Sequence, residues 1–93
     1  MLNYERMKSG GEYLLVTCDN WFYGKDGQKY DGVWGLCRII EAKEVLGLKP
    51  TSSANWYAQF GDGENAMIVA GCRIHYAQVC LKEPVGQNIL KIK

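Results

Sequence analysis

The chain has 93 residues, of which 47% are hydrophobic and 23% charged, with a formal net charge of +1. This length predicts a single domain, and the apolar content excludes a wholly disordered chain. No run approaches the roughly 20 apolar residues that a membrane-spanning helix needs. The near balance of charge argues against strong, unspecific binding to phosphates. Residues 1–11 contain no apolar block, so we expect no signal peptide and a cytoplasmic protein.

The first expected strand covers residues 12–20 and continues through 21–23. Its alternation places Leu14, Val16 and Cys18 on one inward face. An Asp-Gly dipeptide at 26–27 then favours a tight turn, because glycine accepts positive φ. These features predict the first arm of a hairpin.

A second strand is expected over residues 32–40, with Val33, Cys37 and Ile39 facing inward. The following stretch, 38–46, is ambiguous between a bent strand and a short helix, because Ala, Glu, Lys and Leu favour helix while Ile and Val favour strand. We favour extended structure with a turn near Ala42-Lys43.

A loop is expected at 49–53, and residues 55–60 then alternate as a half-buried strand. In this strand the predicted inward side chains are Trp56, Ala58 and Phe60. The run 66–81 would span about 50 Å as one strand. We therefore predict a kink at Gly71 that divides it in two.

These elements predict a mostly β fold: a small, strongly bent antiparallel sheet or an SH3/OB-like barrel of about five strands. The alternative is an α+β fold with a short helix near 38–46. The expected organisation is a flexible segment at 1–11, a single β domain at 12–82 and a loose tail at 83–93.

The four cysteines, at positions 18, 37, 72 and 80, contain no Cys-x-x-Cys pair. Cys18, Cys37 and Cys72 fall on predicted inward faces, so we expect reduced structural thiols. The best metal candidate combines Cys72 and His75 with Cys80 and Cys37. On a strand, however, positions 72 and 75 point to opposite faces, which does not suit tetrahedral zinc. We therefore predict no metal and no cofactor.

Catalytic residues are not indicated either. His75 is the only histidine. Nearly all of the candidate carboxylates lie beside glycine or in expected turns, where they favour turn formation: Asp19, Asp26, Asp31, Asp62 and Glu64. The sequence therefore favours a role without catalysis.

A binding surface is the remaining candidate. Tyr57 shares its predicted outward face with Asn55 and Gln59, and Arg73 shares one with His75. If the two strands are neighbours, these five side chains form one recognition surface of the kind that suits a protein interface. A second set of residues suits single-stranded nucleic acid instead, with stacking rings and positive charge: Tyr57, Trp21, Tyr23, Tyr30, Arg73, Arg38, Lys25 and Lys29.

Four short sequence segments, within roughly residues 12–81, resemble a pattern in short uncharacterised proteins from bacterial chromosomes and mobile elements. They are Asp19-Asn20-Trp21-Phe22-Tyr23, Val33-Trp34-Gly35, Asn55-Trp56-Tyr57 and Ala70-Gly71-Cys72-Arg73-Ile74-His75-Tyr76. The resemblance implies a small intracellular protein of phage or mobile-element origin, and it brings no activity or functional residue with it.

The function that we expect is therefore that of a small intracellular binding module, which acts through a protein partner or by self-association and away from membranes. A small single-stranded nucleic-acid-binding barrel is the alternative, and a small enzyme comes third.

Overall fold

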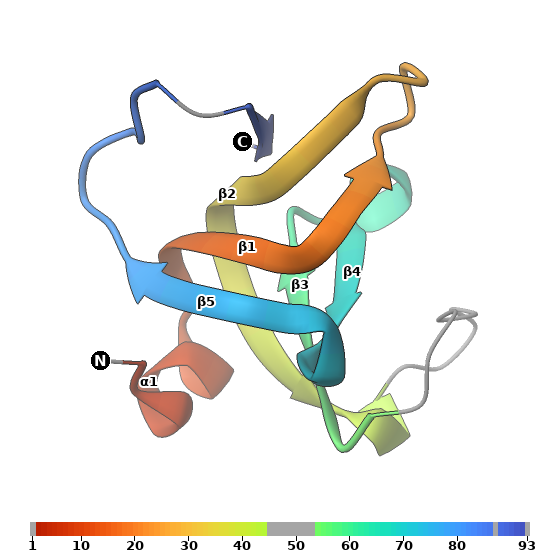
Figure 1. Ribbon diagram of the computed structural model, residues 1–93. Coiled ribbons are helices and arrows are strands. Elements are labelled where there is room, and N and C mark those ends of the chain that lie inside the picture. Colours follow the sequence, from red (N-terminus) through yellow and green to blue (C-terminus); the bar gives the residue numbers. More distant parts are fainter. Residues whose placement is uncertain (1, 45–53, 87, 93) are drawn as a thin grey trace.

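The computed structural model describes residues 2–44, 54–86 and 88–92. Six strands form one sheet in the order β4-β3-β2-β1-β5, and β6 pairs with β2 off this path (Figure 1). The pairs are antiparallel, except that β6 runs parallel to β2. The mostly β prediction is confirmed. The strands are β1 (Glu12–Tyr23), β2 (Lys29–Glu41), β3 (Trp56–Phe60), β4 (Met67–Ala70), β5 (Ile74–Val79) and β6 (Ile89–Ile92).

Helical structure is short throughout the described ranges. The α-helix is α1 (Tyr4–Ser9), and the 3-10 turns are η1 (Ala42–Glu44), η2 (Gly63–Asn65) and η3 (Gly71–Arg73). In the part of the chain that the structure describes, no helix is long and apolar enough to cross a membrane.

The β1–β2 hairpin forms the frame of the sheet, because these two strands are the longest, at 12 and 13 residues. Residues 12–17 pair with 37–32, the register then shifts, and Phe22 and Tyr23 pair with Tyr30 and Lys29. The shift leaves residues 18–21 outside the β1–β2 ladder. A bulge of this kind bends the strand.

The far half of β2 leaves β1 and pairs with β3, from Cys37 opposite Phe60 to Glu41 opposite Trp56. Residues 38–41 are therefore strand, and η1 follows at the predicted turn near Ala42-Lys43. A helix beginning at residue 38 is thus wrong. Residues 45–46 of that alternative and the expected loop at 49–53 lie outside the described residues.

The predicted kink at Gly71 is confirmed, because η3 begins there and separates β4 from β5. The alternation predicted across 66–81 does not continue through this turn. Val69 belongs to the buried core, and Cys72 is exposed rather than inward. The reason is local: a 3-10 turn has three residues per turn, so it breaks the two-residue period of a strand.

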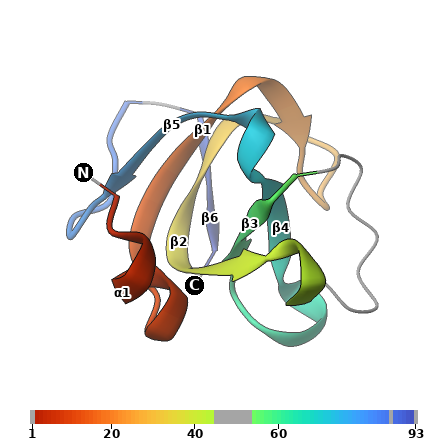
Figure 2. The same cartoon turned by 90° about the horizontal axis from the view of Figure 1, so that it is seen from below.

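Both terminal segments contain regular elements where the sequence predicted none. Asn3 accepts a hydrogen bond from the backbone N–H of Arg6 and caps α1, whose Met7 is fully buried in the core. At the other end, β6 pairs with residues 32–35 of β2. Figure 2 shows α1 and β6 against the sheet. A six-residue helix and a four-residue strand are too short for a periodic sequence signal.

The main core joins β1, β2, β3, β4 and α1 in one cluster. Leu14, Val16 and Cys18 contribute to it as predicted. The other buried members are Met7, Val33, Cys37, Ile39, Ala58, Phe60 and Val69. A smaller cluster of Ile40, Tyr57 and Ala70 packs on the opposite face of β2, β3 and β4. In the described residues no ladder joins β4 to β5, so the strand path is open.

Candidate binding groove beside the β1–β2 hairpin

The five residues predicted as one recognition surface do not come together. Tyr57 is only 4% exposed and packs with Ile40 and Ala70, so its predicted outward position is wrong. The condition that the two strands be neighbours also fails, because β2 and β1 lie between β3 and β5. β3 has a strand on either side and apolar side chains on both of its faces, which alternation alone does not reveal.

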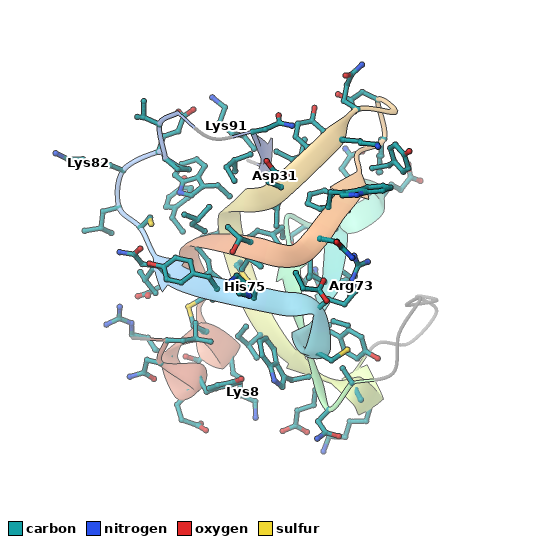
Figure 3. All side chains as sticks on the ribbon, viewed as in Figure 1. Lys8, Asp31, Arg73, His75, Lys82 and Lys91 are labelled. Atoms are coloured by element: carbon teal, nitrogen blue, oxygen red, sulfur yellow. The ribbon has the colours of Figure 1, made fainter. Side chains whose placement is uncertain are left out.

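The other predicted residues are dispersed. Asn55 is exposed just before β3, and half-buried Gln59 donates from its side-chain amide to the Gly61 carbonyl at 3.1 Å. His75 is exposed on β5, and Arg73 lies in η3 beside β1 (Figure 3). Arg73 is the member of the predicted set that the fold brings to exposed aromatic side chains.

Two exposed rings stand near the end of β1. Trp21 and Tyr23 are 42% and 59% exposed, with ring centroids 4.9 Å apart and planes at 74°. The Lys29 ammonium lies 4.3 Å from the Trp21 ring centroid. Lys29 is directly opposite Tyr23 in the hairpin, so strand register brings the cation to the rings. Such an exposed cation–π contact is worth about 0.5–1 kcal/mol.

Arg73 holds the irregular part of β1 in place. Its Nη2 donates to the Trp21 carbonyl at 3.4 Å, and its Nε lies 3.9 Å from an Asp19 carboxylate oxygen. Residues 19–21 have no partner in the described ladders. The Arg73 side chain therefore supplies a hydrogen bond where no neighbouring strand does.

A groove of about 350 Å³ opens between the hairpin end, the start of β4 and β6. We call it the hairpin groove. Lys25, Asp26 and Asn65 provide its polar side chains, and the Lys25 ammonium donates to the Glu64 carbonyl at 2.8 Å. The wall is otherwise mostly apolar, from Tyr23, Ala66, Met67, Leu90 and Ile92.

The turn beside this groove is ordered by Asp26. Its carboxylate accepts from the Tyr30 hydroxyl at 2.6 Å and from the backbone N–H of Gln28 at 3.0 Å. These hydrogen bonds, that from Tyr30 first, lower the pKa of Asp26 below its ordinary value. The Asp26 carboxylate therefore stabilises the turn between β1 and β2.

The buried thiols are poor nucleophiles. Burial raises the pKa of Cys18, and it raises the pKa of Cys37 to about 12. A thiol with so high a pKa carries almost no thiolate at neutral pH. Within the described ranges, no three His, Cys, Asp or Glu side chains converge as metal ligands would.

The sequence pointed to part of this site. Trp21, Tyr23, Lys25, Lys29 and Arg73 were all among the residues expected for a nucleic-acid platform, because of their ring and charge types. Met67, Leu90 and Ile92 were missed. The alternation of Leu90 and Ile92 around Lys91 was a usable signal, but it spans too few residues to stand out.

No protein-family model, curated protein or solved structure matches this chain.

Proposed function

We propose that this protein is a small binding module that holds a segment of a protein partner in the hairpin groove, with an apolar side chain of that segment as the anchor. The observation that carries the proposal is the apolar groove of about 350 Å³ beside the exposed rings of Trp21 and Tyr23. Protein interfaces favour aromatic and methionine side chains such as Tyr23 and Met67 of this groove.

The size and chemistry of the groove favour an anchor over a catalysed reaction. Its volume lies at the lower end of the roughly 300–1,000 Å³ typical of small-molecule sites. Its walls offer no nucleophile with a base beside it, and Asp26 is engaged by Tyr30. A half-open, apolar depression of this size suits one or two side chains of a partner.

Single-stranded nucleic acid is the second candidate, because Trp21 and Tyr23 lie beside Lys29 and Arg73. Two features favour protein. The negative charges of this region balance its positive charges, and the net charge of the chain is only +1. The acidic residues are Asp19, Asp26 and Asp31, and the basic residues are Lys25, Lys29 and Arg73. Moreover, the Lys29 ammonium already lies over the Trp21 ring on which a base would stack.

A finer description of the fold belongs to the same proposal. We propose that the sheet bends towards a small SH3/OB-like barrel whose open side is the groove. The support is that side chains from β1, β2, β3 and β4 share one core cluster. In addition, Cys18 and Phe22 of β1 line a cavity of about 60 Å³ together with the residues of β4, although these two strands are not paired.

The experiment is a selection from a displayed random-peptide library, followed by solution affinities for the selected peptides. Two variants alter the groove: Tyr23→Ala removes an exposed wall, and Ala66→Phe fills the space. Tyr13→Ala is the matched control, because it removes an exposed ring that stacks on Trp34 instead. Thermal melting shows that each variant is folded.

We expect peptides with a shared apolar residue, whose affinity falls by roughly tenfold in both groove variants, equivalent to about 1.4 kcal/mol, and is unchanged in the control. Failure to select any peptide, or affinity that is insensitive to both groove variants, contradicts the proposal. An oligothymidylate that binds with a steep loss of affinity as salt rises favours the nucleic-acid alternative instead.

A further inference from the structure

The far edge of β5 has no strand beside it in the described residues. β5 pairs with β1 and ends the path β4-β3-β2-β1-β5 (Figure 1). An edge strand presents unpaired N–H and C=O groups, and these can pair with another chain.

The direction of these groups follows from the ladder with β1. The Cys80 N–H donates to the Tyr13 carbonyl at 3.0 Å. In an antiparallel pair, every second residue directs its backbone groups towards the neighbouring strand. Counting back from Cys80, Gln78 and Tyr76 face β1, whereas Val79 and Ala77 direct their N–H and C=O groups outward.

This edge lacks the usual protection against pairing. Natural edge strands carry charges, proline or bulges. β5 has the sequence IHYAQV, with no Lys, Arg, Asp, Glu or Pro, and its register shift lies at the Ile74 end, away from Ala77 and Val79. Two apolar side chains follow the strand almost fully exposed, Leu81 at 90% and Val85 at 92%. The second half of β5 is thus an uncharged edge, followed closely by the exposed Leu81.

We propose that this edge pairs with β5 of a second copy of the chain, antiparallel and about a two-fold axis at Gln78. That axis places Ala77 opposite Val79 of the other copy, so their outward groups form reciprocal hydrogen bonds. Tyr76 then lies opposite Cys80 of the other copy, and Leu81 of each copy follows directly after the paired residues. No like charges meet, which is why the same strand is a suitable partner for itself.

The primary experiment is sedimentation velocity of the full chain over a range of concentrations. We expect wild-type protein to shift from one-chain to two-chain mass as concentration rises. Ala77→Pro removes an outward N–H without touching the ladder to β1, and we expect it to abolish the shift. Leu81→Glu should weaken the dimer by roughly tenfold, equivalent to about 1.4 kcal/mol.

Leu36→Glu is the matched control, because Leu36 is an exposed leucine on β2, away from this edge. It should leave dimer formation unchanged. Because Ala77→Pro could also disturb folding, hydrogen exchange of the wild-type amides provides a second measurement. The amides of Ala77 and Val79 should gain protection as concentration rises.

A wild-type chain that stays monomeric, with both amides exchanging rapidly at every concentration, overturns the proposal. So does a dimer that forms equally well in the Ala77→Pro and Leu81→Glu variants. No wall residue of the hairpin groove lies on β5, so the groove variants and the edge variants test the two proposals separately.

Discussion

The indole of Trp56 packs directly on the backbone of Gly71. A Cβ added at Gly71 would lie 2.7 Å from both Cδ2 and Nε1 of that ring. Trp56 also meets the ring of Tyr4 edge-on, with centroids 5.2 Å apart, and it packs against the main core. Trp56 therefore links β3 to η3 and to the N-terminal segment. Because Gly71 has no side chain, the residue that separates β4 from β5 also leaves space for the indole.

Gly71→Ala should therefore destabilise the fold by about 1–3 kcal/mol, the usual cost of overpacking. Gly10→Ala is the control, because a Cβ there would meet only the Arg6 carbonyl oxygen at 3.8 Å. Urea unfolding measures both variants. Equal, small losses of stability in the two would mean that Trp56 does not pack on Gly71 as described.

The N-terminal helix should contribute to global stability, because Met7 is fully buried among core residues. Met7→Ala is expected to cost about 2–5 kcal/mol. Lys8→Ala serves for comparison, since it removes the partly exposed ion pair with Glu41, at 2.7 Å, and ion pairs of this kind contribute little, so we expect a much smaller loss than for Met7→Ala. A Met7→Ala variant as stable as wild type would show that α1 is not docked.

The buried Cys37 thiol should make stability fall at high pH. Burial raises its pKa from the ordinary 9.0 to about 12 in the folded state. Between these values the unfolded chain has lost the proton while the folded chain keeps it, so the unfolded state gains stability as pH rises. The slope from this one group reaches about 1.4 kcal/mol per pH unit. Below pH 9.0 it contributes no pH dependence.

Urea unfolding under reducing conditions measures this effect at one pH below 9.0 and at one between 9.0 and about 12. Cys37→Ala lowers stability at both pH values, but it should lose part of the pH dependence. All other titrating groups are common to the two proteins, so the difference isolates Cys37. Identical pH dependence in wild type and variant would contradict the burial of this thiol.

Much of the fold was predictable where alternation acts on one buried face. Leu14, Val16 and Cys18 follow that rule, and the length of the run 66–81 required the break at Gly71. Tyr57 was mispredicted because β3 is covered by apolar side chains on both faces, so its polar neighbours in sequence did not mark a solvent face.

The candidate site was predictable only in its residue types. Trp21, Tyr23, Lys29 and Arg73 are aromatic or basic, which marks them for recognition in any context. Their assembly depends on a register shift in β1 and on η3, and neither has a sequence signal as strong as alternation. Leu90 and other groove residues come from a four-residue strand whose partner is distant in sequence. Pairing of that kind is decided by tertiary packing.

The most direct test of the hairpin groove is a map of backbone amide chemical shifts during titration with a selected peptide. We predict that the largest changes occur at Tyr23, Met67 and Leu90, with Tyr13 and Leu36 unaffected. Changes centred on Tyr13 and Leu36, or confined to β5, would contradict the assignment of partner binding to the groove.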